Sequence, residues 1–250
     1  MLRDTHDKLR PLLERRDHGF RWRGKDISRI EGLSDAVFAF AITLLVVSLE
    51  APKQFVELVH MMHGFVTFAI CFAMLILIWH AQYIYFRRYA LDDGVSFLLN
   101  ATLLFVVAFY VYPMKFLFSV FVNAVTGYHE LDAAGAVIKP MRGASDWRTL
   151  MIIYSAGFTG VYAIFSLLYL HAYRLRQVLE LNALEIYQTR GVVQENLLML
   201  GIGVLSLMLA LLNSPQMSGM TYILIGPLQS LLGWVHGKGS KRIAAQMGTT

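Results

Sequence analysis

The chain has 250 residues, of which 56% are hydrophobic and only 16% are charged, and its formal net charge is +5. A chain of this length and composition is too apolar for an ordinary soluble domain. Its single cysteine, Cys71, excludes an internal disulfide and a thiolate metal site. The basic residues form no aromatic-interleaved surface of the kind that binds nucleic acid, so we expect no nucleic-acid partner. The sequence therefore predicts an integral membrane protein.

Six apolar segments approach or exceed the roughly 20 residues that a helix needs to cross a bilayer, and none shows the alternation of a barrel strand. They cover residues 33–50, 58–85, 95–121, 148–173, 192–213 and 219–235. We therefore predict an all-α bundle of six transmembrane helices over residues 33–235. A basic N-terminal tail at 1–32 and a C-terminal tail at 236–250 flank this bundle.

The basic residues outside these spans are distributed unevenly between the two sides of the membrane. The N-terminal tail carries nine Lys and Arg residues, the second–third and fourth–fifth connections carry two and three, and the C-terminal tail carries three. The other side carries only Lys53, Lys139, Arg142 and Arg148. Because basic residues concentrate on the cytoplasmic side, we expect both tails in the cytoplasm and an attraction to anionic membrane lipids. Glu185 lies in the basic fourth–fifth connection, which is typical of a surface helix.

Polar residues lie at a similar depth in the first three predicted spans. At 1.5 Å of helical rise per residue, Asp35 lies roughly 9 Å beyond Arg29 in the first span. His80 and Asn100 lie about 10 Å inside the second and third spans. An ionisable group at this depth is costly in lipid, so we expect Asp35 to face the interior and find a partner. The cluster either locks the helices together or handles protons and ions directly through Asp35 and His80.

The apolar body of the first span carries a second pattern. Phe40, Thr43, Leu44 and Val47 recur at i, i+3, i+4 and i+7, which places them along one helix face. Periodicity alone is compatible with core, lipid contact or pore lining for this face.

Two parts of the chain resemble a known family. Arg29, Ser34 and Asp35, followed by AVFAFAITLLVVSL, resemble the RxxxFSD signature and first pore helix of the bacterial relatives of the endosomal and lysosomal potassium channels, the transmembrane protein 175 family. Trp79 and His80 resemble that family's WxxHH segment. The run FRRYALDDGVSFLLNATLLF, which includes Asn100, resembles the following connection and third helix. The resemblance is specific over residues 29–115, and beyond them only the layout of the spans agrees.

The resemblance implies a potassium-permeable cation channel in the bacterial inner membrane, formed by four copies of the chain. Each subunit would contribute its first helix to a central pore, lined by Phe40, Thr43, Leu44 and Val47. A hydrophobic ring of such side chains can gate by dewetting, and the chain contains no TVGYG filter sequence. Thr43 either presents its hydroxyl to the ion or donates it to the carbonyl of Ala39, as threonine does readily in helices. The permeant potassium ion is the only ion we expect, without a cofactor or a metal site.

The sequence departs from the family pattern at three positions. Leu33 replaces the usual phenylalanine of the signature, which is a near-conservative change of volume. Ala81 stands where many members have a second histidine, so a role of paired histidines does not transfer. Phe40 stands where a smaller aliphatic residue often forms the narrowest ring, so the width of the constriction is not carried over by the resemblance.

A secondary transporter or proton-coupled carrier is the alternative function. Carriers typically contain paired broken helices in repeated halves, whereas here only the sixth span, with Gly226 and Pro227, is interrupted. An enzyme would need a convergent nucleophile, base or metal ligands, and the sequence shows no such set beyond the level of Asp35. We therefore predict a channel and not an enzyme.

Overall fold

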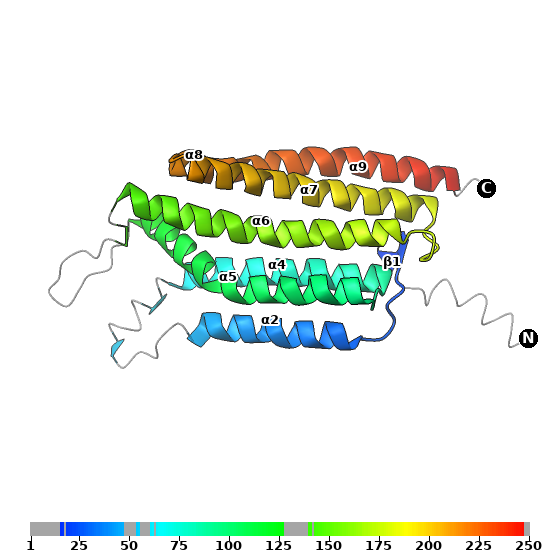
Figure 1. Cartoon of the computed structure of the whole chain (residues 1–250), viewed down its shortest axis with the longest axis horizontal. Coiled ribbons are helices and arrows are strands. Elements are labelled where there is room, and N and C mark those ends of the chain that lie inside the picture. Colours follow the sequence, from blue (N-terminus) through cyan, green and yellow to red (C-terminus); the bar gives the residue numbers. More distant parts are fainter. Residues whose placement is uncertain are drawn as a thin grey trace, which may run out of the picture.

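The computed structural model describes residues 16–17, 19–47, 54–55, 61–62, 64–127, 140–141 and 143–247. They form a bundle of long helices that run roughly parallel to one axis (Figure 1). The first described strand and the C-terminal end of the last helix lie at the same end of this bundle, which we call the terminal end. We call the opposite end the distal end.

The elements follow one another as strands and then helices. They are β1 (Arg16–Asp17), β2 (Phe20–Arg21), α2 (Arg29–Val47), α4 (Phe65–Tyr89), α5 (Gly94–Thr126), α6 (Ala144–Arg174), α7 (Ala183–Leu211), α8 (Pro215–Met220), the short 3-10 helix η1 (Thr221–Leu224) and α9 (Ile225–Met247). Among the described residues, the five helices α2, α4, α5, α6 and α7 are long and apolar enough to cross a membrane. The predicted all-α transmembrane class is confirmed.

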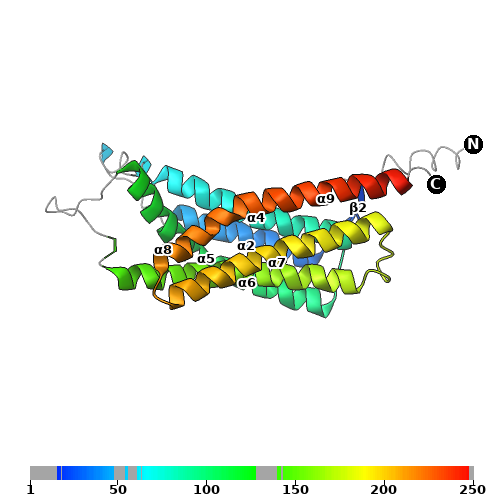
Figure 2. The ribbon, with the colours of Figure 1, turned by 90° about the horizontal axis from the view of Figure 1, so that it is seen from above.

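The sixth predicted span differs from the structure in its boundaries. Residues 219–235 are divided among the end of α8, η1 and the first half of α9. The three elements run together beside α7 along the length of the bundle (Figures 1 and 2). The second half of α9 carries Lys238 and Arg242, and these charges explain why α9 is less apolar than the other long helices.

Side-chain caps fix the start of three helices at the terminal end. Ser28 and Glu31 form a reciprocal capping box, since each side chain accepts from the backbone N–H of the other, at 3.2 and 2.8 Å. Asn182 and Glu185 form the equivalent box at the start of α7. Asp93 caps α5 by accepting from the backbone N–H of Val95. These caps satisfy donors that a helix N-terminus otherwise leaves without an intrahelical partner.

Asp93 also ties α5 to α6. Its carboxylate contacts Nε2 of His171 at 2.9 Å and accepts from the hydroxyl of Ser96 at 2.6 Å. Partial burial alone would raise the pKa of the Asp93 carboxyl, but the hydrogen bond from Ser96 and the charge of His171 hold it below its usual value. The α4–α5 connection is thereby held against the end of α6.

Hydroxyl groups bring α6, α7 and α8 together, and a small residue brings α5 close to α6. The hydroxyls of Ser155, Ser206 and Ser218 are linked in series at 2.8 Å per contact, and all three residues are buried. Gly157 of α6 lies directly beneath the ring of Tyr110, where a Cβ atom would approach that ring to 2.2 Å. Small residues and interhelical hydrogen bonds are the usual means of close helix packing in a membrane, where lipid is as apolar as the helices.

The N-terminal segment before α2 is folded onto the bundle. Phe20 is completely buried against Tyr89, and the guanidinium groups of Arg23 and Arg88 lie 5.6 and 5.1 Å from the centre of its ring. The backbone N–H groups of Arg23 and Gly24 both donate to the carbonyl of Arg87 at the end of α4. A Cβ atom at Gly24 would lie 2.9 Å from the carbonyl oxygen of Phe86, so this close approach requires glycine.

Glu185 fastens this segment to α7. Its carboxylate accepts from Nε of Arg21 at 3.2 Å and from the terminal guanidinium nitrogen of Arg23 at 2.8 Å, and its side chain has no exposed surface. The expectation of a surface helix was therefore wrong for Glu185. Sequence position suggested an exposed connection, but the two arginines compensate the cost of burying this carboxylate.

The Glu185 cluster generates a stability prediction. Glu185→Gln leaves two guanidinium groups facing a neutral amide in a buried site, so we expect the free energy of unfolding to fall by about 3 kcal/mol. Thermal unfolding of the purified protein in detergent measures this loss. Glu180→Gln is the matched control, because Glu180 is an exposed residue on the connection just before α7. Equal melting temperatures for the two variants would contradict a structural role for the Glu185 carboxylate.

Candidate functional site

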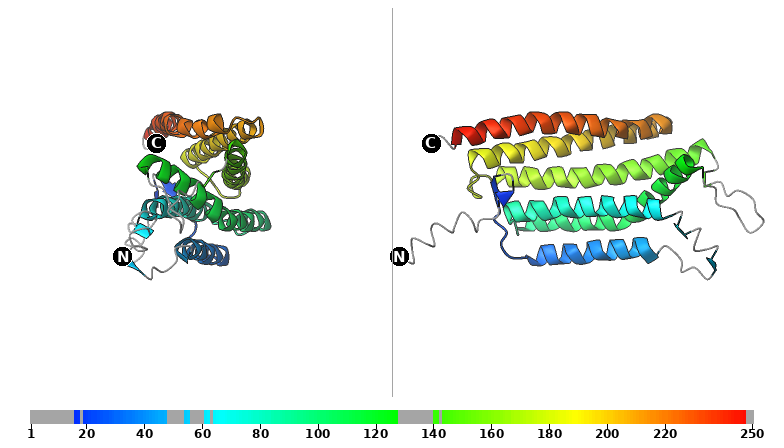
Figure 3. Two further views of the ribbon diagram at one scale, coloured as in Figure 1. Left: turned by 90° about the vertical axis from the view of Figure 1, so that its left-hand side faces the viewer. Right: turned by 180° about the vertical axis from the view of Figure 1, so that it is seen from behind.

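Helix α2 lies at the edge of the bundle and packs against α4 and α5 (Figure 3). The side facing these helices carries Ile30, Ser34, Phe38, Ala41 and Leu45, all of which are buried. Because these residues recur with helical spacing, they occupy one face of α2. The opposite face is exposed in the single chain.

A buried polar cluster joins α2 to both neighbours. The hydroxyl of Ser34 accepts from the side-chain amides of Gln82 on α4, at 2.7 Å, and Asn100 on α5, at 2.9 Å. It donates to the carbonyl of Ile30 at 2.8 Å, and the amide of Gln82 also donates to the side-chain oxygen of Asn100. Ser34, Gln82 and Asn100 are each at most 2% exposed. We call these three residues the amide node.

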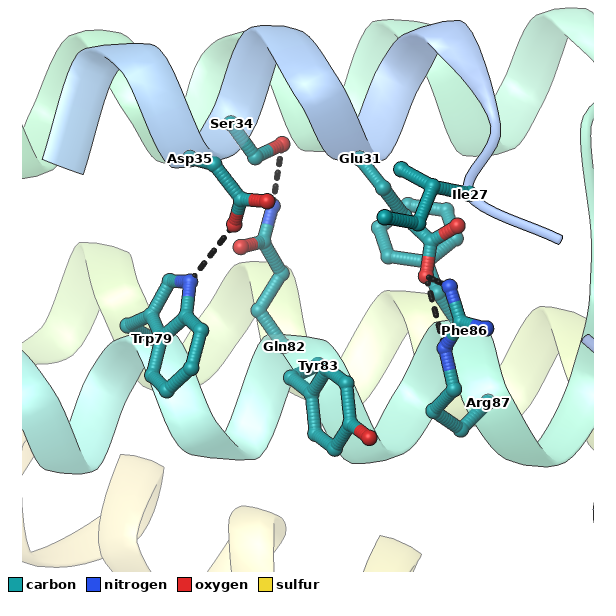
Figure 4. Close-up of a pocket in the computed structure, with 9 residues that line it drawn as sticks. All are labelled: Ile27, Glu31, Ser34, Asp35, Trp79, Gln82, Tyr83, Phe86 and Arg87. Atoms are coloured by element: carbon teal, nitrogen blue, oxygen red, sulfur yellow. Dashed lines mark hydrogen bonds and ion pairs between the residues drawn. The ribbon is translucent and has the colours of Figure 1, made fainter.

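Asp35 forms a second contact beside the amide node. Its Oδ1 accepts from the indole N–H of Trp79 on α4 at 2.7 Å (Figure 4). The two residues line a cavity of about 230 Å³ between α2 and α4. Asp35 is exposed in the single chain, because it lies about 100° around the helix from Ser34. The predicted partner for Asp35 exists, but it is the indole of Trp79 at the edge of the helix pair.

A buried ion pair between Glu31 and Arg87 lines the opposite end of this cavity. Nε of Arg87 donates to Oε1 of Glu31 at 3.1 Å, and a terminal nitrogen of the same guanidinium donates to that oxygen as well (Figure 4). Arg87 also donates to the carbonyl of Gly24 at 2.9 Å and to the carbonyl of Asp26. The ion pair therefore fastens both the start of α2 and the segment before it to the end of α4.

Two of the residues that match the family motifs, His80 and Arg29, lie outside these contacts. His80 is exposed and its ring lies 6.3 Å from that of Tyr83, with no contact to Asp35 or Asn100 among the interactions of the described residues. The depth of His80 is close to that of Gln82, but two residues along a helix turn a side chain by about 200°, away from α2. Arg29 is exposed at the first residue of α2.

Sequence reasoning missed Gln82 and Glu31. Gln82 follows Trp79 by three residues and therefore projects from the same side of α4, toward α2. A lone amide within an otherwise apolar stretch is the available signal for such a residue, since it needs a partner inside a membrane. Ser28 and Glu31 match the spacing of a capping box, which could have located the true start of α2 at Arg29.

The face of α2 that was predicted to line a pore is open in the single chain. Phe40 is 58% exposed and Val47 is 68% exposed, Thr43 is exposed, and Leu44 is partly buried at the edge of this face. The hydroxyl of Thr43 donates to the carbonyl of Ala39 at 2.9 Å. Its oxygen keeps acceptor capacity toward the exposed side. The back-bond and a contact with a cation are therefore compatible, because a cation needs only the oxygen.

Among the described residues, His, Cys, Asp and Glu side chains form no group of three or more that could hold a metal ion. The polar groups near α2 are instead arranged as donors and acceptors for one another. These polar contacts therefore hold α2 in place. They leave its opposite face apolar, with the hydroxyl of Thr43 as a polar group on that face.

The amide node generates a second stability prediction. Gln82→Leu removes two hydrogen bonds and leaves the buried side-chain oxygen of Asn100 without its Gln82 donor, so we expect it to destabilise the protein by about 1–3 kcal/mol. His80→Leu on the same helix removes an exposed side chain and should change stability by less than about 0.5 kcal/mol. Thermal unfolding in detergent compares the two variants. If His80→Leu were the more destabilising change, the assignment of Gln82 as the central residue would be incorrect.

Comparison with known proteins connects this geometry to a family. The family model described as endosomal/lysosomal potassium channel TMEM175 matches residues 29–110. These residues contain α2, α4 and the first half of α5, and with them the whole amide node.

Known relatives extend the match along the chain. A potassium channel of Marivirga tractuosa is 39% identical over 233 residues, which cover 90% of this chain and 93% of that protein. A potassium channel of Chamaesiphon minutus is 31% identical over 100 residues, which cover 37% of this chain and 49% of that protein. A crystal structure of a variant of the potassium channel MtTMEM175, bound to a nanobody fusion protein, has a TM-score of 0.77 at 38% identity. The match covers 89% of this chain and 99% of that chain.

These relatives are named as channels and not as enzymes, so the prediction of a non-enzymatic protein is confirmed. The family match also confirms the resemblance seen in the sequence, and the apolar helices agree with an integral membrane protein. The chain belongs to the TMEM175 potassium channel family, as a relative of its bacterial members.

Proposed function

We propose that four copies of this chain form a potassium-permeable channel in which α2 of each subunit lines a central pore. The observation that carries this proposal is the two-sided character of α2. One face is held by the amide node, and the opposite face, with Phe40, Thr43 and Val47, is apolar and open at the edge of the bundle. An edge position allows the same helix from several subunits to meet around one axis.

The chemistry of this face supports a hydrophobic constriction. Rings of Phe40, Leu44 or Val47 would present only apolar atoms, and a narrow apolar passage excludes water and ions until it widens. A ring of Thr43 oxygens would supply the polar atoms between these rings. The chain has no TVGYG sequence, so ion discrimination would depend on pore width and on these few oxygens.

The polar contacts near α2 support a positioning role for the amide node and for Asp35. The three residues of the node hydrogen-bond to one another, and Asp35 contacts Trp79 and not His80. A proton path through Asp35 and His80 would need these two side chains to communicate. We therefore assign both groups of contacts to holding α2 at the angle that a pore requires.

The charge distribution supports an orientation with both termini in the cytoplasm of a bacterial cell. β1, β2 and the C-terminal end of α9 lie at the terminal end, together with the α4–α5 and α6–α7 connections (Figure 1). Most Lys and Arg residues in the described part of the chain belong to these segments, to the N-terminal segment before α2 or to the helix ends beside them. By the positive-inside rule this end faces the cytoplasm, where it also meets the anionic lipid of the inner membrane.

Potassium flux into liposomes tests the proposed pore face. Phe40→Ala and Leu44→Ala should raise potassium flux and weaken the preference for potassium over sodium, because dewetting depends steeply on pore radius. Thr43→Val should alter ion preference with little loss of protein. Downhill flux that does not saturate or couple to another gradient distinguishes this channel from a carrier.

The controls must lie on exposed apolar surface elsewhere. Phe105→Ala on α5 matches Phe40→Ala, since Phe105 is 73% exposed, and Leu167→Ala on α6 matches Leu44→Ala. Ala41 and Leu45 are unsuitable controls on α2, because both are completely buried and a substitution would disturb the core. If Phe105→Ala changed conductance while the α2 variants did not, the pore would be lined by another helix.

Disulfide crosslinking tests the central position of α2 separately. Val47→Cys should give crosslinked dimers under mild oxidation, because a ring around an axis brings identical residues together. The native Cys71 is completely buried and should contribute little background. Val125→Cys, at an exposed position near the distal end of α5, should remain monomeric on a denaturing gel. Equal crosslinking of both variants would argue against a specific α2 ring.

A further inference from the structure

A proline bends α5 and opens a cavity at the distal end of the bundle. Pro113 has no amide hydrogen and its ring clashes with the carbonyl of Phe109, so a helix kinks there. Beyond this point α5 turns toward α6 and α8 (Figures 1 and 3). A cavity of about 600 Å³ lies between the bent part of α5, the start of α6 and the α8–η1 segment. This volume is within the range of about 300–1,000 Å³ that is typical of small-molecule sites.

The wall of this cavity is apolar. Its lining contains no Asp, Glu, Lys or Arg residue. The rings of Tyr154 and Tyr222 form its inner wall and pack edge to face at 5.2 Å. The hydroxyl of Tyr222 donates to Ser155 at 3.0 Å and is thereby used within the helix packing. The cavity therefore offers surface for hydrocarbon and no ionic partner for a charged ligand.

The cavity is bordered by exposed apolar side chains. Three large apolar residues that line it, Phe121, Met220 and Ile223, are each more than half exposed. Trp147 and Gln216 also line the cavity, near the distal ends of α6 and α8. Indole groups favour the boundary between hydrocarbon and headgroups, so Trp147 marks the level at which a lipid headgroup would lie.

We propose that this cavity binds an acyl chain of a phospholipid from the leaflet at the distal end. The occupant follows from the uncharged lining, from the position among membrane-spanning helices and from an opening through exposed apolar side chains. The headgroup would stay at the level of Trp147, with the chain lying against Tyr222 and Met151. The cavity is lined by residues of α5, α6, α8 and η1 and by none of α2. Binding of an acyl chain there does not require that the protein conduct ions.

Photolabelling of the full-length protein in vesicles of phosphatidylethanolamine and phosphatidylglycerol tests the site. The probe is a phosphatidylglycerol with a photoreactive group on one acyl chain, and labelled peptides are identified by mass spectrometry. We expect labelling of residues 117–124, 147–154 and 215–223 above the level of exposed α5 residues around Phe105. Two variants that fill the cavity, Ala124→Trp and Gly219→Leu, should lose this excess.

Gly219 is suited to this purpose because a Cβ atom there meets no atom within 4 Å, so the new side chain enters open space. Val125→Trp is the control, since Val125 is the next residue on α5, is 71% exposed and does not line the cavity. It should keep the excess labelling. Labelling that is uniform over the lipid-facing helices would overturn the proposal and indicate that another segment or a second copy closes the cavity. Excess labelling that persists in both filling variants would overturn it as well.

Discussion

The position of α2 depends on the hydrogen bonds of one serine hydroxyl. In a membrane, lipid competes equally well for apolar side chains, so burial of Phe38 or Leu45 alone does not select one helix arrangement. Ser34 donates within its own helix and accepts from two other helices, and each of these contacts has a defined direction. Buried hydrogen-bonded clusters of this kind favour one packing, because a shift separates polar atoms from their partners. The rest of the site, from the Asp35–Trp79 contact to the open apolar face, follows from this fixed rotation of α2.

The terminal end of the bundle carries a second set of directed contacts. Glu31 pairs with Arg87, Glu185 pairs with Arg21 and Arg23, and Asp93 contacts His171. Each carboxylate belongs to a helix start or its cap, and each cation belongs to a different segment, so the ion pairs connect elements that are distant in sequence. Charged groups are tolerable here because this end lies at the membrane boundary, where water and headgroups reduce the cost of burial.

Hydropathy and helical period predicted the fold class, because membrane spans must satisfy their backbone hydrogen bonds within helices. Depth along the predicted spans grouped Asp35, His80 and Asn100, and the family motifs added Ser34 and Trp79. His80 was included because depth along a helix can be counted from the sequence, whereas rotation around the helix axis depends on which neighbour the helix faces. Glu185 was taken as exposed for a related reason: its partners Arg21 and Arg23 lie more than 160 residues away, and nothing local reveals that contact.

Different kinds of interaction stabilise the two ends of the bundle. The amide node and the ion pairs give the terminal end contacts that resist rotation of individual helices, since each depends on angle as well as distance. At the distal end, α5 departs from its neighbours beyond Pro113, and the described contacts there are mainly aromatic packing and the serine hydroxyls between α6, α7 and α8. Apolar packing tolerates small displacements better than directed hydrogen bonds do, provided that volume is conserved. Small displacements of α2 are therefore accommodated more easily toward Val47 than at Ser34, where the helix is hydrogen-bonded to both of its neighbours.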